Sequence, residues 1–217
     1  FTSAKGEPTG GLYGLSAMLM KLMTDLKPDY LVACYDLPEP TYRHQAYDEY
    51  KAGRQKTDDA LVAQIERSRD IFKAFNIPIY EKPGYEADDI VGTLAARARK
   101  HKLETFMVTG DKDSMQLIDE HTVMYALKGE EVTLTSHPGV QEKFGCEPAA
   151  VIEVLALMGD SSDNVPGVRG VGEKTATKLI QQFGTLEKLF AHLDEVKGDS
   201  LRAKLAEQKE MAFLSRQ

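Results

Sequence analysis

Apolar positions at helical spacing open the chain. Between residues 9 and 26, leucines recur three or four positions apart behind the start signal Pro8-Thr9, and this spacing predicts a buried helix. A second long helix is predicted after Thr57-Asp58-Asp59, whose side-chain oxygens can cap its first turn. The apolar side chains of that helix that we expect to face a core are Leu61, Ile65, Phe72 and Phe75.

Short apolar runs that stop at turn residues predict strands. We expect buried strands at residues 30–35 and 105–109, a short strand at 76–80, and two more at 123–126 and 132–135 on either side of Lys128-Gly129. Between them, an apolar stripe in residues 90–98 and a short segment from His137 to Phe144 predict helices. The pattern after Pro148 is wholly helical. The sequence therefore predicts an α/β part in residues 1–145 and a helical part in residues 146–217.

Two tight groups of carboxylates lie where predicted elements begin or end. Glu86, Asp88 and Asp89 stand at the start of one helix, and Asp111 and Asp113 follow the strand at 105–109. In an open α/β sheet, loops and helix N-termini converge outside the carboxyl ends of the strands, so both groups can face a hard cation there. Each group alone is also typical of helix-dipole or turn chemistry.

Three further acids extend this pattern. Asp36 directly follows the strand at 30–35, where a turn role is the simple alternative. Asp160 and Asp163 are three positions apart and would face the same way on a helical turn, although a capping or Asx-turn role is equally open to them. Taken together, the four sites favour a cation site built from oxygen ligands.

Basic and aromatic residues alternate in residues 41–56. Arg43, Lys51 and Arg54 are interleaved with Tyr50 and other tyrosines, a mixture that can follow a phosphate backbone and stack on bases. A solvated helix with amphipathic tyrosines is the alternative.

A glycine-rich segment runs from Gly167 to Thr175. It resembles a phosphate loop, but Glu173 separates Gly172 from Lys174 and the segment follows a helix rather than a strand, so nucleotide hydrolysis is excluded. A glycine hairpin that leads into a helix N-terminus remains, where free backbone N–H groups can meet a phosphate.

Charge and cysteine content narrow the setting. The net charge is −7, but the eight acids at the candidate cation site contribute −8 and leave −7 + 8 = +1 for the rest of the chain, so a nucleic-acid partner is not excluded. No apolar run of about 18 residues or secretory leader is visible. Cys34 and Cys146 lack metal-like spacing and predict free thiols in a reducing compartment.

Six motifs carry a resemblance to a known family. YDLPEPTYRH, YKAGR, GYEADDIVGTLA, TGDKD, LALMGDSSDNVPGV and GVGEKTATKL closely resemble the 5′→3′ exonuclease, or flap endonuclease, domain of bacterial DNA polymerase I. The resemblance runs along essentially the whole chain. It implies a mixed central sheet flanked by helices, of the PIN or flap-endonuclease type, with a helical arch near residues 41–75 and a C-terminal helix–hairpin–helix.

The resemblance also assigns roles to single residues. It implies two divalent ions, Mg²⁺ or Mn²⁺, that activate water for attack on a DNA phosphodiester, and it places their ligands at Asp36, Glu86, Asp88, Asp89, Asp111, Asp113, Asp160 and Asp163. Lys51 and Arg54 match cationic residues that steady the reacting phosphate. DNA-binding positions are Arg43, Tyr50, Gly167, Gly170, Gly172, Lys174 and Thr175, and the hairpin carbonyls of the family also hold K⁺.

The implied setting is DNA replication and repair in the bacterial cytosol. We expect a monomer that grips duplex DNA bearing a 5′ flap or 5′ end, with a fused or associated DNA polymerase and no membrane contact. The family begins with a strand that ends in Asp-Gly, followed by Tyr-Arg, whereas this sequence starts at Phe1, after both. A DNA-junction module that binds without cutting is therefore the first alternative, and an RNA nuclease of related fold is the second.

Overall fold

A computed structural model describes residues 1–4, 6–129 and 131–217. The packing of the backbone divides the chain into two compact units, and each of them is discontinuous in sequence. Unit 1 comprises residues 1–39 and 55–90, and unit 2 comprises residues 40–54 and 91–217. The division near residue 145 that the sequence suggests stays a prediction.

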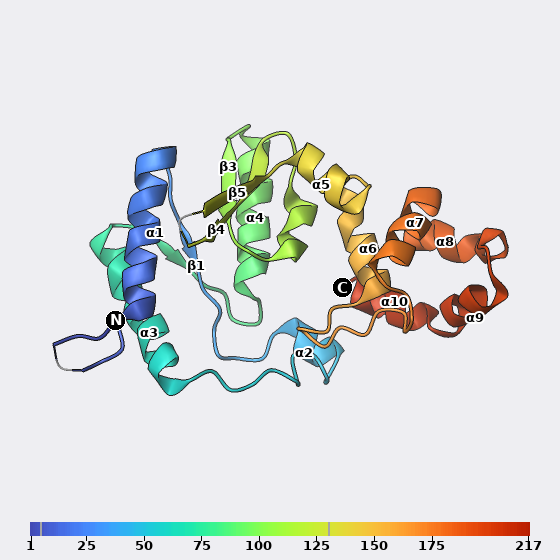
Figure 1. Cartoon of the computed structure of the whole chain (residues 1–217), viewed down its shortest axis with the longest axis horizontal. Helices are drawn as coiled ribbons and strands as arrows, with labels where there is room; N and C mark the ends of the chain where they lie inside the picture. The colour runs from blue at the N-terminus through green and yellow to red at the C-terminus, as the bar shows by residue number, and fades with distance from the viewer. Residues whose placement is uncertain (5, 130) are drawn as a thin grey trace. The chain divides into compact units, whose positions relative to one another are not determined.

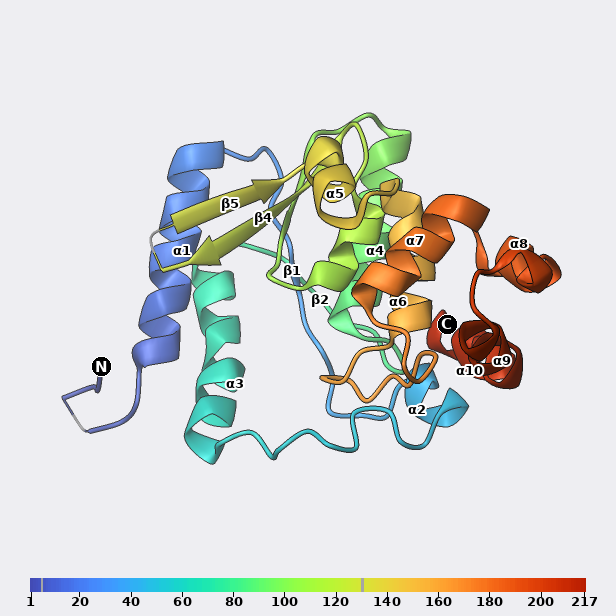
Figure 2. The same ribbon diagram turned by 45° about the vertical axis from the view of Figure 1, so that its right-hand side comes forward.

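Unit 1 is built on two long helices and a short parallel strand pair. Helices α1 (Gly10–Leu26) and α3 (Asp59–Ala74) lie side by side (Figures 1 and 2). Strand β1 (Ala33–Cys34) pairs in parallel with β2 (Ile79–Tyr80). Asp58 caps α3, because its carboxylate accepts the Ala60 N–H at 2.8 Å. Both predicted helices, and the cap, are confirmed.

Fewer apolar side chains are buried in unit 1 than the sequence predicts. Phe72 and Phe75 pack on a small core of Leu19, Ala33 and Ile77, but Leu61 and Ile65 are 45% and 47% exposed. The prediction that these two face a core is wrong, because only the C-terminal half of α3 reaches that core. Tyr30 is also wrongly predicted as buried, since the strand pairing covers only two residues of the 30–35 run and leaves Tyr30 82% exposed.

The sheet of unit 2 combines parallel and antiparallel pairing. Strands β3 (Thr105–Val108) and β4 (Thr122–Lys128) are parallel, and β4 and β5 (Glu131–Thr135) form an antiparallel hairpin (Figure 2). Met107 is buried, whereas its neighbours Phe106 and Val108 are each 38% exposed. The prediction of a fully buried strand at 105–109 is therefore wrong for one face. An α/β fold with mixed sheets is confirmed, and the described strands hydrogen-bond as two sheets, one in each unit.

Helices make up the rest of unit 2 (Figure 1). Helix α4 (Ala87–Lys100) begins in unit 1 and continues into unit 2. The remaining helices and 3₁₀ turns are α2 (Tyr42–Ala46), η1 (Lys112–Leu117), α5 (His137–Phe144), η2 (Pro148–Ala150), α6 (Val151–Met158), α7 (Glu173–Phe183), α8 (Leu186–Ala191), η3 (Leu193–Glu195), α9 (Asp199–Glu207) and α10 (Lys209–Ser215). The all-helical prediction after Pro148 is confirmed. In the described parts of the chain, no helix combines the length and apolar character needed to span a bilayer.

A buried carboxylate ties three of these helices together. Glu153 of α6 is 9% exposed, and it accepts the Leu186 N–H at the start of α8 and an Arg216 guanidinium N–H beyond α10, each at 3.1 Å. Arg216 also pairs with Glu187 at 2.6 Å, and its hydrogen bond lowers the pKa of Glu187 to about 2. A buried charge is tolerated only when it is paired in this way.

We expect Arg216→Ala to lower the free energy of unfolding of unit 2 by about 3 kcal/mol, because the variant leaves the Glu153 carboxylate buried without a cation. Urea denaturation followed by circular dichroism measures it. Asp199→Asn, which removes an exposed pair with Arg202, should change stability by less than about 1 kcal/mol. Equal effects of the two variants would contradict this account of Glu153.

Candidate metal centre and phosphate-binding residues

In unit 1, Asp36 meets the N-terminus of α4. Asp36 lies just after β1, and its Oδ1 accepts the Ala87 N–H at 2.7 Å. Ala87 is the first residue of α4, so its N–H has no partner within the helix. The carboxylate satisfies that donor and also interacts favourably with the positive end of the helix dipole.

Glu86, Asp88 and Asp89 surround the same helix start. The Asp89 Oδ2 accepts the Glu86 N–H at 2.8 Å, while the Glu86 carbonyl accepts the Asp89 N–H at 3.0 Å, an exchange that resembles half of a capping box. Burial, and then the charge of Asp88, raise the pKa of the Cys34 thiol. The structure thus groups Asp36, Glu86, Asp88 and Asp89 around β1 and α4, and it also gives Asp89 a hydrogen bond that caps this helix start.

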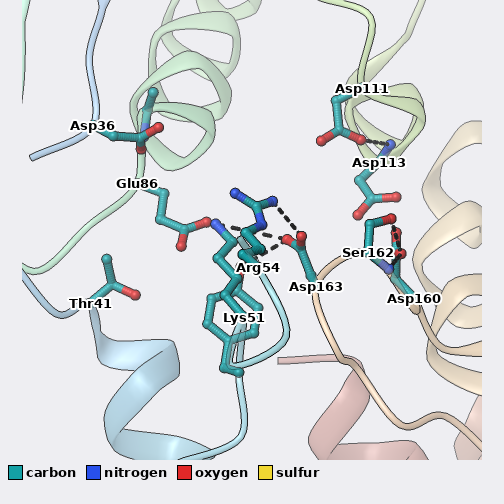
Figure 3. A network of polar contacts seen from close by, with 12 residues as sticks. Asp36, Thr41, Lys51, Arg54, Glu86, Asp111, Asp113, Asp160, Ser162 and Asp163 are labelled. Carbon is teal, nitrogen blue, oxygen red and sulfur yellow. Dashed lines mark hydrogen bonds and ion pairs between the residues drawn. The ribbon is translucent and has the colours of Figure 1, made fainter. Parts of the chain in front are cut away.

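In unit 2, Asp113 is a carboxylate with an unsatisfied oxygen. Its backbone N–H is capped by Asp111 Oδ1 at 2.9 Å (Figure 3), but Asp113 Oδ1 is buried without a hydrogen-bond partner. Burial raises the pKa of Asp113 to about 6, and the charges of Asp111, Asp160 and Asp163 act in the same direction against an opposing effect of Lys112. Four carboxylates therefore act on one another here.

Asp160 has its own set of partners. The Asp160 Oδ1 accepts the Ser162 N–H at 2.7 Å and the Ser162 hydroxyl at 2.5 Å, and Oδ2 lies 3.3 Å from the Lys112 ammonium. Burial acts to raise the pKa of Asp160, but these hydrogen bonds and the Lys112 charge hold it below its ordinary value. The helical turn predicted for Asp160 and Asp163 is wrong, because Asp160 pairs with Val165 as a β-bridge. The Asx-turn alternative describes Asp160 correctly.

Asp163 contacts three of the residues predicted to act on DNA, namely the two phosphate-binding cations and one aromatic residue. Its carboxylate pairs with Arg54 and lies 3.8 Å from the Lys51 Nζ (Figure 3). It also accepts the Tyr50 hydroxyl at 3.3 Å. The Lys51 ammonium also lies over the Tyr50 ring, 4.9 Å from its centroid. Arg43 instead stacks on Tyr42 in α2, at 4.6 Å from the ring centroid. The structure therefore brings Lys51, Arg54 and Tyr50 together around one anionic side chain.

The glycine hairpin has the predicted connection to a helix. Gly172 is the N-cap residue of α7, and its carbonyl accepts the Thr175 N–H at 3.0 Å. Gly167 is buried with a φ of +58°, and a Cβ there would lie 2.4 Å from the Gly159 nitrogen, so only glycine allows this backbone approach. Gly170, Gly172 and Lys174 are exposed. Contact of this hairpin with DNA stays a prediction.

Two family models divide the chain between them. A model described as the 5′-3′ exonuclease N-terminal resolvase-like domain matches residues 1–145, and one described as the 5′-3′ exonuclease C-terminal SAM fold matches residues 146–217. The chain belongs to the 5′-3′ exonuclease family. This membership confirms the resemblance that the six motifs carry.

Relatives of this exonuclease-family chain are considerably longer. The DNA polymerase I of Bacillus caldotenax is 44% identical over 214 residues, and that of Bacillus subtilis (strain 168) is 45% identical over 215 residues. Each alignment covers 98% of this chain and 24% of the relative. The chain thus spans about a quarter of the length of these relatives.

Solved structures share the fold. The bacteriophage T5 D15 protein, co-crystallized with metal ions, matches with a TM-score of 0.80 at 21% identity, over 96% of this chain and 80% of that one. A complex of the T5 D15 flap endonuclease with DNA and metal ions gives 0.78 at 20% identity, over 96% and 79%. The catalytic core of Rad2 with a DNA substrate gives 0.59 at 18% identity, over 96% and 68%. The α/β fold with a C-terminal helical part is confirmed, and the non-cleaving alternative gains no support.

The carboxylates of this exonuclease-family chain are ligands that a hard cation prefers, but they are not arranged around one ion position in either unit. Within residues 1–4, 6–129 and 131–217, no three His, Cys, Asp or Glu side chains are grouped so as to hold a metal ion. Lys112, Arg54 and Lys51 occupy the carboxylates of Asp160 and Asp163 instead. The unsatisfied Asp113 oxygen and the all-oxygen donor set nevertheless fit Mg²⁺ or Mn²⁺ better than zinc.

Three further residues hold this region together without a signal in the sequence that marks their roles. Lys112 and Ser162 bind Asp160, and the Asn164 side chain binds the backbone of residue 49. Each of them lies between or next to predicted carboxylates in the sequence, and this position is the one feature that could have indicated a role at the site. Nothing in the spacing distinguishes their roles from those of ordinary turn residues.

In the metal-free protein, Asp113 should make stability depend on pH. Its pKa is about 6 in the folded chain against an ordinary value of 3.8. The folded state therefore binds this proton more tightly, and that contribution is complete below pH 3.8 and is lost as the pH rises through about 6. We expect the melting temperature in EDTA to fall across this window, and to fall less in Asp113→Asn, which cannot ionise.

The control for this experiment is Asp25→Asn, which removes an exposed partner of Lys21. Its melting profile should keep the shape of the wild-type profile. A profile of Asp113→Asn that parallels the wild type throughout would show that Asp113 does not titrate in this way.

Proposed function

We propose that this chain hydrolyses phosphodiester bonds in DNA that carries a 5′ flap or a free 5′ end, using Mg²⁺ or Mn²⁺. Membership of the 5′-3′ exonuclease family supports the reaction class. The observation that carries the proposal is the buried Asp113 oxygen that lacks a hydrogen-bond partner, with three other carboxylates acting on the same side chain. A divalent cation supplies the charge that such a cluster lacks.

The proposed ligands form one group of carboxylates in each unit. They are Asp36, Glu86, Asp88 and Asp89 in unit 1, and Asp111, Asp113, Asp160 and Asp163 in unit 2. When bound, two divalent ions would supply an activated water and stabilise the attacking and leaving oxygens of an in-line displacement. The hydrogen bonds to Ala87, Glu86, Asp113 and Ser162 orient individual carboxylates before any ion binds.

Lys51 and Arg54 are proposed to hold the reacting phosphate. The Lys51 ammonium is a compact charge and the Arg54 guanidinium can form two parallel hydrogen bonds, so the pair suits the charge and the shape of a phosphodiester. Both already bind the carboxylate of Asp163, which is an anion of similar geometry. A DNA phosphate would therefore compete with Asp163 for these two cations.

The glycine hairpin is proposed to grip duplex DNA away from the reaction. Exposed backbone at Gly170 and Gly172, together with the Lys174 ammonium, offers donors and charge to phosphates without reading sequence. Following the family resemblance, we propose that the carbonyls of Gly167 to Thr175 also bind K⁺. We further propose that the chain acts as a monomer in the bacterial cytosol. A DNA polymerase is proposed to work beside it, as the name of its relatives suggests.

Cleavage of labelled flap DNA, single-stranded DNA and single-stranded RNA in Mg²⁺ tests the proposal. We expect flap DNA to be cut with 5′-phosphate ends in Mg²⁺ or Mn²⁺, and EDTA to abolish cutting, because the carboxylates do little chemistry without a cation. Binding of flap DNA without any cutting would favour a non-cleaving module, and preference for RNA would favour an RNA nuclease. Cleavage that persists after exhaustive chelation would contradict the metal-dependent mechanism.

One carboxylate variant in each unit extends this test to the ligands. Asp88→Asn and Asp111→Asn should each lower turnover by about a hundredfold, the scale seen when one group that stabilises transition-state charge is removed. Circular dichroism should show an intact fold, since both side chains are exposed. Wild-type turnover in either variant would remove that residue from the ligand set.

Lys51 and Lys174 should differ in what they contribute. We expect Lys51→Ala to lower single-turnover cleavage by about a hundredfold while duplex binding changes little. Lys174→Ala should instead weaken binding to all duplex sequences alike and reduce the salt dependence of log K by about one unit of slope. Equal losses of binding and turnover in Lys51→Ala would reassign Lys51 to general electrostatic attraction.

A further inference from the structure

The turn that carries Lys51 and Arg54 is joined to the loop that carries Asp163. In one direction the Lys51 backbone N–H donates to the Asp163 carbonyl at 2.8 Å. In the other, the Asn164 side-chain amide donates to the Glu49 carbonyl at 2.7 Å. Both bonds lie within unit 2. Two reciprocal bonds between neighbouring residues fix the relative position of the two segments.

Both sides of this joint have an unusual backbone conformation. Lys51 has a φ of +58° and Asn164 a φ of +57°, which places each in the left-handed region. Asparagine adopts this conformation more readily than most other non-glycine residues, because its short side chain can hydrogen-bond to nearby backbone. The long lysine side chain offers no such local stabilisation. Bonds from outside the turn therefore add to its own hydrogen bonds in holding this conformation at Lys51.

We propose that Asn164 is a positioning residue that holds Lys51 and Arg54 for the reaction, an inference that rests on the proposed function. The turn is compact, because Ala52 N–H donates to the Glu49 carbonyl at 3.1 Å and Arg54 N–H to the Lys51 carbonyl at 3.0 Å. Fixing Glu49 thus fixes the residues that follow it. Asn164 acts on Lys51 and Arg54 only through this backbone.

Asn164 suits this task better than its charged neighbour Asp163. The pairs of Asp163 with Lys51 and Arg54 are side-chain contacts, and an incoming phosphate or cation competes for them directly. The Asn164 amide is neutral and binds a backbone carbonyl, so a charged ligand draws on that bond less than on the ion pairs of Asp163. Asn164 can therefore hold the turn in place while the side chains exchange partners.

A purely structural role for Asn164 would lie in the shape of its own loop, which needs a residue that tolerates positive φ. Asn164→Gly separates the two roles, because glycine adopts this backbone conformation freely but has no amide donor. Asn76 offers a matched control, since it has the same φ of +57° at the end of α3 in unit 1. Asn76→Gly makes the same chemical change away from the joint.

Two measurements test the proposal on the full chain. In the absence of DNA and metal, trypsin should cut after Lys51 and Arg54 about fivefold faster in Asn164→Gly than in the wild type or Asn76→Gly, as expected for the loss of one hydrogen bond. Single-turnover cleavage of flap DNA at saturating DNA should fall by about the same factor. DNA binding should stay within about twofold of the wild type.

The outcomes separate this inference from the proposed function. If the wild-type chain cuts no DNA, the proposed function fails, and trypsin still decides whether Asn164 holds the turn. If the wild type cuts and Asn164→Gly has unchanged turnover, or unchanged trypsin cleavage, the positioning role is overturned. An equal effect of Asn76→Gly at Lys51 and Arg54 overturns it as well.

Discussion

Mutual repulsion among carboxylates is the constraint on which unit 2 depends. Burial raises the pKa of Asp113 to about 6, and the charges of Asp111, Asp160 and Asp163 act in the same direction. Such a cluster persists only if positive charge or hydrogen-bond donors compensate it. In this structure Lys112, Lys51 and Arg54 provide the charge, and backbone N–H groups provide donors. The loop of residues 160–165 and the turn before residue 54 are thereby held together by the same interactions that neutralise the cluster.

Local signals explain which parts of the fold the sequence predicts well. Asp58 caps α3 as expected, and Gly145 ends α5 with a φ of +62°, because each position depends on its own side chain or lack of one. Burial depends on partners that the local sequence does not specify. Leu61 and Ile65 have helical spacing but no core against them, and the alternation at Phe106, Met107 and Val108 reflects a sheet covered on one face only.

The candidate site also has some features that follow from local sequence and others that depend on distant partners. Residue type and position place Asp111 and Asp113 together after β3 and Asp36 after β1, and the structure adds that Asp36 accepts a hydrogen bond at the start of α4. The spacing of Asp160 and Asp163 is misleading, because it fits a helical turn, whereas Asp160 forms an Asx-turn with Ser162. The role of Asn164 is not predictable from the sequence for a different reason. Its partner is the backbone carbonyl of residue 49, 115 positions away, and no side-chain pattern records a backbone partner.

Asp163 links the electrostatics of unit 2 to the proposed chemistry. Its carboxylate has a limited number of lone pairs, and Arg54, Lys51 and Tyr50 already approach them. Under the proposed function, a divalent ion at Asp163 would weaken the hold of Asp163 on Lys51 and Arg54, and a phosphate at these cations would free the carboxylate for an ion. Each ligand would then lower the cost of binding the other, which is positive linkage. The linkage requires only that the turn keep its place while the contacts exchange, and the backbone bonds at Lys51 and Asn164 meet that requirement.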